Sequence, residues 1–188
     1  LKATEDISWL GAFFQSVSAR TAGFSTYAIG DFTNAGLFVL CVLMFIGASP
    51  GSTGGGIKTS TFFVLFQAAR SACMKKNVCA FRRSISRQNI SKASMITVLS
   101  MMVVCVATFL LCVLEPDRTF IQVFFEVVSA FGTVGLSTGI TPGLSVAAKI
   151  VIIFVMFIGR LGAFTLLTIW ISHPEPKIRY SEENIAIG

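Results

Sequence analysis

Charged residues are scarce in this sequence. Only 13% of its 188 residues are Asp, Glu, Lys or Arg, whereas 54% are hydrophobic. A soluble domain carries about 25% charged residues. The low charge content therefore excludes an ordinary soluble protein and predicts a protein that lies in a membrane.

Residues that commonly bind metals or perform catalysis are also few. The one histidine, His173, lies next to Pro174, and the five cysteines include no C-x-x-C pair. This pattern excludes the usual zinc sites and a disulfide framework. The sequence contains no recognisable catalytic pair either, so we predict that the protein is not an enzyme and has no covalently bound cofactor.

Acidic residues are absent from the most basic part of the chain, residues 70–92. Such a run occurs in nucleic-acid-binding proteins, but here it separates two apolar stretches. The excess of Lys and Arg is then typical of a cytoplasmic loop, and we expect no nucleic acid as a partner. The basic residues are Arg70, Lys75, Lys76, Arg82, Arg83, Arg87 and Lys92.

Apolar runs of two lengths are present. A helix needs roughly 20 apolar residues to cross a bilayer, and residues 94–114 and 146–171 are long enough. Residues 7–19 and 120–130 are too short, so each is expected to form a helix that enters the membrane and turns back. Such a segment is stable only where protein or water satisfies its backbone polar groups.

Both short apolar runs are followed by the pattern Thr-x-Gly, and the surrounding sequence is repeated. Residues 13–19 match residues 124–130, and residues 21–26 match residues 133–138. Such a repeat defines the architecture and has to be identified before other patterns. We name residues 21–24 the first Thr-x-Gly segment and residues 133–136 the second Thr-x-Gly segment.

A glycine-rich stretch interrupts the apolar residues 32–69. Residues 47–60, which we name the glycine loop, contain five glycines and one proline, a composition that cannot sustain a helix. The apolar residues 32–46 would form a helix only about 22 Å long, whereas the apolar core of a bilayer is about 30 Å thick. The glycine loop is therefore predicted to begin inside the membrane and to line an ion path or a cavity.

The Thr-x-Gly segments have the chemistry of a potassium filter, in which backbone carbonyl oxygens replace the water around the ion. Their glycines can adopt the positive φ angles that aim carbonyls inward. The C-terminal ends of the short helices, near Ala19 and Ala130, would add negative partial charge. The predicted ion-binding residues are Thr21, Ala22, Gly23 and Phe24 in the first segment and Thr133, Val134, Gly135 and Leu136 in the second.

These motifs resemble those of the Trk/Ktr-type potassium uptake proteins, a superfamily that includes plant high-affinity potassium transporters. The resemblance is carried by residues 18–24, residues 133–139, Arg160 and the glycine loop with its ending Ile57-Lys58-Thr59. It implies an all-α membrane protein with four potassium-channel-like repeats, each helix–pore-helix–filter–helix, around one pore. It also implies a homodimer and a cytoplasmic nucleotide-binding regulatory subunit.

The resemblance divides the chain into four parts. Residues 1–70 would be the third repeat without its first helix, and residues 71–93 the basic cytoplasmic loop. Residues 94–171 would be the complete fourth repeat, and residues 172–188 a cytoplasmic tail. The remaining repeats of the same transporter would complete the pore, surrounded by membrane lipid.

A gate below the filter is also implied. Arg160 interrupts an apolar span, where a charge costs about 2.5–3.5 kcal/mol, so it either caps carbonyls of the glycine loop or forms a positive barrier to cations. Lys58 either neutralises the loop or is an ordinary interfacial lysine. Arg20 and Glu126, expected at the ends of the short helices, are candidates for an ion pair. The predicted gate consists of Gly51, Gly54, Gly55, Gly56, Lys58 and Arg160.

Together, these features predict potassium uptake across the plasma membrane, in a bacterium the inner membrane, by a multi-pass protein whose transported ligand is the potassium ion. Each segment has one glycine where tetrameric potassium channels have Gly-Tyr-Gly, so weakly selective sodium/potassium transport is an alternative. A sodium-coupled transporter would also contain a broken helix. A channel-like subunit of an ATP-driven potassium pump would have similar filter segments.

Overall fold

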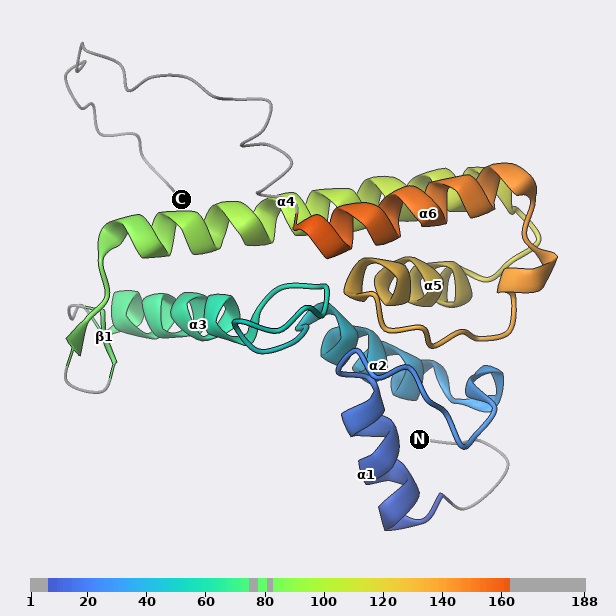
Figure 1. Ribbon diagram of the computed structural model, residues 1–188, viewed down its shortest axis with the longest axis horizontal. Coiled ribbons are helices and arrows are strands. Elements are labelled where there is room, and N and C mark those ends of the chain that lie inside the picture. The colour runs from blue at the N-terminus through green and yellow to red at the C-terminus, as the bar shows by residue number, and fades with distance from the viewer. Residues whose placement is uncertain (1–6, 75–77, 81–82, 163–188) are drawn as a thin grey trace, which may run out of the picture.

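The computed structural model describes residues 7–74, 78–80 and 83–162, which form a layered arrangement of helices (Figure 1). The prediction of a helical protein is confirmed, apart from one hairpin of two-residue strands. The α-helices are α1 (Trp9–Ser18), α2 (Asn34–Phe45), α3 (Thr59–Cys73), α4 (Arg87–Leu114), α5 (Phe120–Gly132) and α6 (Val146–Leu161). The other elements are η1 (Ile29–Asp31), β1 (Cys79–Ala80), β2 (Arg83–Ser84) and η2 (Thr141–Gly143).

Polar residues begin most of these helices. The first backbone N–H groups of a helix have no partner within it, and a serine or threonine at the N-cap accepts from one of them. This bond is present in four helices that begin directly after Ser or Thr. The N-caps are Ser8 for α1, Thr33 for α2, Ser86 for α4 and Ser145 for α6.

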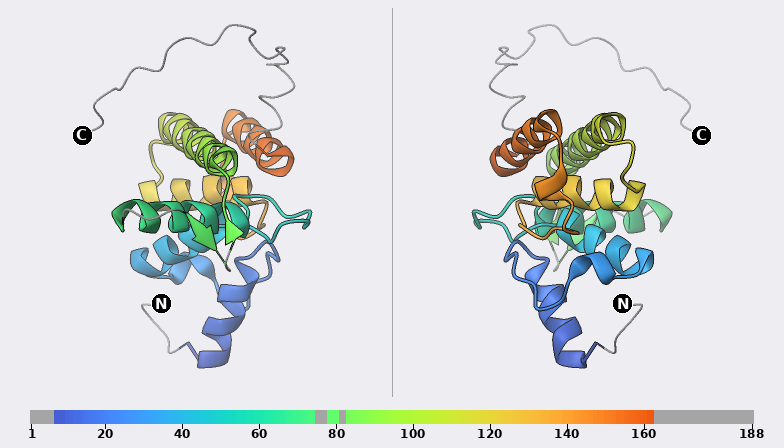
Figure 2. Two further views of the ribbon diagram at one scale, coloured as in Figure 1. Left: turned by 90° about the vertical axis from the view of Figure 1, so that its left-hand side faces the viewer. Right: turned by 90° about the vertical axis from the view of Figure 1, so that its right-hand side faces the viewer.

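Helix α5 lies at the centre of the fold. It packs against α2, α4 and α6, and Figure 2 shows it beneath α4 and α6, which lie side by side. Residues 125–132 of α5 are all buried. The largest fully buried side chains include Phe125 and Phe131 of α5, Met44 of α2 and Leu111 of α4. The helix before the second Thr-x-Gly segment is therefore held on several sides.

Helix α1, which precedes the first Thr-x-Gly segment, packs much less extensively against the rest of the fold than α5 does. Figure 1 shows it at a steep angle to α5 and α6. Only Gln15 and Ser18 of α1 are buried, whereas Trp9 is 94% and Phe13 is 67% exposed. The two sequence repeats thus have unequal support within the described residues.

Large apolar side chains cover the outer faces of α4 and α6. Among the described residues, α4 is long and apolar enough to cross a membrane, and α2 and α5 are apolar but shorter. A continuous apolar surface of this kind suits lipid or another protein surface better than water. The exposed side chains include Val98, Met102, Val106, Phe109 and Val113 on α4 and Val146, Ile150, Ile153, Phe154 and Phe157 on α6.

The basic loop is shorter in the structure than residues 71–93. Helix α3 continues to Cys73, and α4 begins at Arg87, before the apolar residues 94–114. Hydropathy indicates which part of a helix suits a membrane, but Lys, Arg and Gln are themselves good helix formers. Ser86 therefore caps α4 well before its apolar part begins. Between the two helices, β1 pairs antiparallel with β2.

Helix α6 ends earlier than the apolar run 146–171 predicts. It stops at Leu161, and Gly162 after it has φ +83°. Glycine adopts this left-handed conformation without steric cost and commonly ends helices. Arg160 consequently lies in the last turn of α6 and not in the middle of a long helix. The tail and the rest of the predicted span, residues 163–188, lie outside the described residues.

A polar contact joins the ends of α4 and α6. The Glu115 carboxylate, just beyond α4, accepts a hydrogen bond of 2.7 Å from the Ser145 backbone N–H. This bond, with smaller contributions from Arg118 and Lys149, lowers the pKa of Glu115 below its ordinary value. The contact is therefore retained at neutral pH and is lost only as the pH falls through that lowered pKa.

Candidate functional site

The two Thr-x-Gly segments lie side by side, although more than a hundred residues separate them. A Cβ atom built on Gly23 would overlap the Val134 carbonyl oxygen and would lie 3.5 Å from the Gly135 Cα atom. The segments follow the C-terminal ends of α1 and α5, which approach each other in Figure 1. The structure thus brings together the two groups of residues that the sequence predicts to bind an ion.

The backbones of the two segments have matching shapes. Gly23 and Gly135 have φ angles of +78° and +94°, as expected for residues that turn the chain. Thr21 and Thr133 are also left-handed, with φ angles of +65° and +50°. A non-glycine residue in this region costs about 1–2 kcal/mol. The left-handed conformation of the threonines was not predicted from the sequence, where its only signal is that the pattern occurs twice.

Serine hydroxyls anchor both segments to the preceding helices. Ser18 Oγ donates a short hydrogen bond to the Phe24 carbonyl, and Ser129 Oγ donates one of 2.6 Å to the Leu136 carbonyl. These residues occupy equivalent positions in the repeat. The last carbonyl of each segment thereby has one of its two lone pairs occupied by a hydroxyl of its own short helix.

Burial distinguishes the two segments. Val134 and Leu136 are 4% and 3% exposed, and Gly135 between them is exposed. Their side chains therefore pack into the core and leave the glycine backbone facing open space. In the first segment Phe24, which corresponds to Leu136, is 72% exposed.

The glycine loop contacts the threonine of each segment. Gly55 N–H donates a hydrogen bond of 3.0 Å to Thr133 Oγ1, and a Cβ on Gly54 would lie 2.7 Å from Thr21 Oγ1. A bridge between Ile46 and Ile57 closes the base of the loop. The loop therefore interrupts the α2–α3 unit directly beside both Thr-x-Gly segments.

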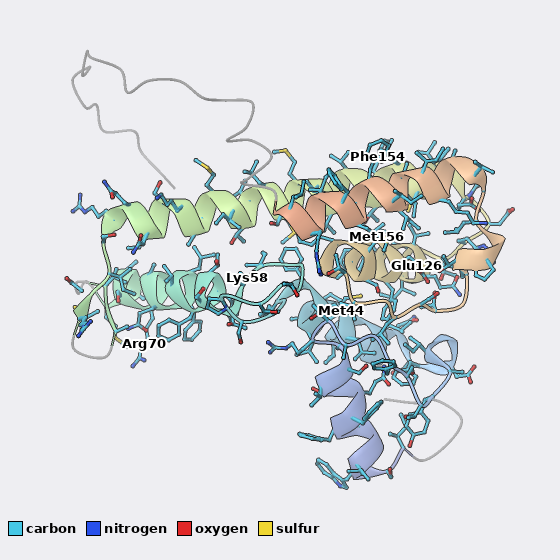
Figure 3. All side chains as sticks on the ribbon, viewed as in Figure 1. Met44, Lys58, Arg70, Glu126, Phe154 and Met156 are labelled. Carbon is cyan, nitrogen blue, oxygen red and sulfur yellow. The ribbon has the colours of Figure 1, made fainter. Side chains whose placement is uncertain are left out.

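Lys58 binds the loop from within. Its ammonium group donates to the carbonyls of Ser52 at 2.9 Å and Gly54 at 2.6 Å. Figure 3 shows Lys58 at the start of α3, where the loop ends. The structure thus has Lys58 bound to loop carbonyls, in the manner expected of a residue that neutralises the loop.

Arg160 lies near the same region. The preceding residue, Gly159, packs so tightly on α5 that a Cβ there would lie 2.7 Å from the Phe131 carbonyl carbon. Arg160 itself is exposed, and no hydrogen bond joins it to the glycine loop among the described residues. Because Arg160 directly follows Gly159, its backbone lies close to the end of α5, where the second segment begins.

The expected pair of Arg20 and Glu126 does not form among the described residues. Glu126 lies in the middle of α5, where it is buried, and not at the end of a short helix. Its carboxylate accepts hydrogen bonds from Ser137, Thr138 and Thr141, which follow the second segment. Arg20 lies just beyond α1 and is exposed. Sequence spacing placed both residues near the filters but could not identify their partners.

A helical fold with apolar outer faces, two adjacent Thr-x-Gly segments and an intervening glycine loop defines a helical membrane transporter. The chain belongs to the TrkH family of cation transport proteins, whose family model matches residues 2–181. This family comprises transporters rather than enzymes, so the expectation of a non-enzymatic protein is confirmed, as is the resemblance to Trk/Ktr proteins.

Named relatives agree with this assignment. The chain is 45% identical over 182 residues to the Ktr system potassium uptake protein B of Vibrio alginolyticus, covering 96% of this chain and 40% of the relative. It is 41% identical over 192 residues to the Ktr system potassium uptake protein D of Bacillus subtilis, covering 100% and 42%. The chain therefore spans about two fifths of the length of these relatives.

A solved structure has the same fold. The crystal structure of the potassium transporter TrkH from Vibrio parahaemolyticus matches with a TM-score of 0.68 and 28% sequence identity. The match covers 86% of this chain and 37% of that chain. The likeness extends over most of the described elements.

Proposed function

We propose that this chain forms part of a pore that carries potassium ions into the cell. The observation that carries the proposal is the adjacency of two Thr-x-Gly segments with matching backbone conformations. Extended carbonyls in such segments can replace the water around a potassium ion. The names of the relatives, which include potassium uptake proteins, support the same ion.

Within this proposal, the ion is bound by the carbonyls of residues 21–24 and 133–136. The exposed Gly135 between two buried side chains leaves the backbone, rather than side chains, available to the ion. The C-terminal ends of α1 and α5 contribute negative partial charge. The Phe24 and Leu136 carbonyls also anchor their segments, because each accepts a hydrogen bond from a serine of the preceding helix.

Two segments do not close a ring around an ion, so further repeats of the same transporter complete the pore. We propose the third and fourth channel-like repeats for this chain, in a homodimeric, multi-pass protein of the plasma membrane. The word "system" in the names of the Ktr relatives supports a separate regulatory component, which we propose to be a cytoplasmic nucleotide-binding subunit.

The glycine loop is proposed as the gate because it contacts the threonine at the start of each filter segment. Gly51, Gly54, Gly55 and Gly56 give it a backbone that can rearrange at little steric cost. Lys58 holds it in the observed position, and Arg160 places a positive charge nearby. Movement of the loop away from the threonines would then open the path.

Replacing Lys58 with methionine is expected to raise leakage through the closed pore. The change removes two hydrogen bonds from a charged donor to loop carbonyls, and such bonds contribute about 1.5–3 kcal/mol each. Rubidium leak from proteoliposomes should rise by about tenfold. Lys149→Met is the matched control, since it removes a lysine–carbonyl bond at Pro142, far along the chain from the loop. Equal leak in the two variants would contradict the role of Lys58.

Replacing Arg160 with alanine is expected to raise cation flux severalfold. A positive charge beside the path repels an approaching cation, and the low dielectric of the membrane strengthens that repulsion. Flux through Arg160→Lys, which keeps the charge, should stay close to that of the wild type. Unchanged flux in a normally folded Arg160→Ala transporter would count against the barrier.

The direct test of the proposed function is ion uptake into liposomes that contain the whole transporter. Rubidium, as a tracer for potassium, and sodium are supplied separately at equal concentrations. Uptake of rubidium well above that of sodium supports a potassium filter. Comparable uptake of both ions supports the weakly selective alternative, which the single glycine in each segment favours. Absence of rubidium uptake would contradict the proposal.

A further inference from the structure

A buried carboxylate on α5 binds the residues that follow the second Thr-x-Gly segment. Glu126, labelled in Figure 3 on α5, is 5% exposed. Its Oε1 atom accepts from Ser137 Oγ at 2.6 Å and from Thr138 N and Oγ1 at 3.0 and 3.2 Å. Its Oε2 atom accepts from Thr141 Oγ1 at 2.9 Å. All four donors lie in residues 137–141, which follow the second segment and which we name the outgoing loop; Thr141 also begins η2.

The first segment has a weaker version of the same arrangement. Gln15 of α1 precedes Glu126 by 111 positions, the spacing that relates the two short helices, and is 3% exposed. Its Oε1 atom accepts one bond of 3.2 Å from Ser25 Oγ, and Ser25 corresponds to Ser137. The Gln15 Nε2 atom has no partner among the described residues. One repeat therefore has an ionisable group with four bonds where the other has an amide with one.

An ionised carboxylate at Glu126 can accept from all four of these donors. An ionised carboxylate only accepts hydrogen bonds, and its two oxygens together offer about four lone-pair positions. The backbone N–H of Thr138 and the hydroxyls of Ser137, Thr138 and Thr141 can all donate. Bonds to an ionised acceptor are about twice as strong as bonds between neutral groups. They hold the outgoing loop to the central, buried part of α5.

The second segment is thus fastened twice, at its C-terminal residue and just beyond it. Ser129 holds the Leu136 carbonyl, and two residues beyond that carbonyl Glu126 holds the Thr138 backbone. Leu136 is buried in the core. The first segment has the serine bond, but its Phe24 side chain is exposed and its glutamine bond is single.

We infer that Glu126 is a positioning residue for ion discrimination, which it exerts by fixing the second Thr-x-Gly segment. This inference deepens the proposed function and depends on it. Where selectivity comes from the fit of the ion, discrimination between potassium and sodium requires the carbonyls to keep their spacing when a smaller ion enters. The second segment resists that adjustment, and the first segment yields to it. The two repeats therefore contribute unequally to selectivity.

Two substitutions separate the geometric effect of Glu126 from its charge. Glu126→Gln keeps the shape, because its Oε1 can accept from Ser137 and Thr138 while its Nε2 donates to Thr141 Oγ1. Loss of the negative charge weakens attraction for every monovalent cation alike, so the half-saturation concentration for rubidium rises while the rubidium-to-sodium ratio stays within about twofold. Glu126→Ala removes all four bonds. It lowers the ratio by about tenfold, or roughly 1.4 kcal/mol in the difference between the two ions.

The experiment measures rubidium and sodium uptake by the whole transporter in liposomes, with Gln15→Ala as the matched control in the first repeat. Gln15→Ala removes one neutral bond and lowers the ratio less than threefold. The inference is overturned if Glu126→Ala keeps the wild-type ratio, or if Gln15→Ala lowers it as much. A purely structural role would reduce the amount of folded transporter without changing the ratio.

Two further outcomes need their own interpretation: failure of Glu126→Ala to fold, and a wild-type transporter that does not prefer rubidium. Should Glu126→Ala fail to yield folded transporter, the double variant Ser137→Ala, Thr141→Val removes the bonds of these two hydroxyls without creating a buried cavity at Glu126. Because both Thr138 bonds remain in that variant, its ratio falls less than in Glu126→Ala, and an unchanged ratio also overturns the inference. A wild-type transporter that takes up both ions equally overturns the inference but leaves cation transport intact, whereas one that takes up no rubidium contradicts the proposed function itself.

Discussion

Gly23→Ala is expected to reduce rubidium uptake to background. Gly23 has φ +78°, where an alanine is strained, and strain of this kind costs about 1–3 kcal/mol. In addition, the new methyl group would overlap the Val134 carbonyl oxygen of the other segment. The two segments would have to separate, and both sets of proposed ligands would move. Uptake of rubidium into liposomes, normalised to folded transporter, measures the effect.

Gly139→Ala is the control for backbone strain alone. Gly139 has φ +93°, but nothing lies within 4 Å of a Cβ built there. It follows the second segment and is not among the proposed ion-binding residues. This variant should keep most of its uptake, although it carries similar strain. If both variants lost uptake to the same extent, the close approach of the two segments would not be the cause.

Gly159→Val is expected to destabilise the fold. A side chain at Gly159 would overlap the carbonyl group of Phe131, at the end of the helix that carries the second segment. Inserting extra carbon atoms into a packed contact typically costs about 1–3 kcal/mol, and backbone atoms cannot move aside as a flexible side chain can. The midpoint of thermal unfolding in detergent should fall by several degrees.

Ile153→Ala is the matched control for this effect. Ile153 lies on the same helix and is 62% exposed, so its truncation leaves the contact between α5 and α6 intact. Its unfolding midpoint should stay near that of the wild type. If Gly159→Val unfolded at the same midpoint as the wild type, α6 could not approach α5 as closely as it does in the structure.

Much of the architecture was predictable because hydropathy and repetition are properties of the chain itself. The shortage of charge indicated a membrane protein, and the family assignment agrees. The glycine-rich residues 47–60 predicted an interruption that lies between Phe45 and Thr59 in the structure. Glycine and proline act locally on the backbone, so their effect is visible without knowledge of the fold. The assignment of the segments to ion binding stays a prediction.

The ends of helices were predicted less well. Apolar runs placed the start of one helix at residue 94 and the end of another at residue 171, whereas α4 begins at Arg87 and α6 ends at Leu161. Hydropathy indicates where a helix meets lipid, but a helix starts and stops at its caps. Ser86 and Gly162 decide these two ends, and neither residue stands out from an apolar profile.

The sequence by itself determined the membrane class, the duplicated short helix with its Thr-x-Gly segment, and the break between α2 and α3. These features depend on local composition and on similarity along the chain. Only the tertiary structure decided that Gly23 lies against Val134, that the glycine loop reaches Thr133, and that Glu126 binds the outgoing loop rather than Arg20. Contacts between distant residues depend on how helices pack in three dimensions, which spacing along one chain does not specify.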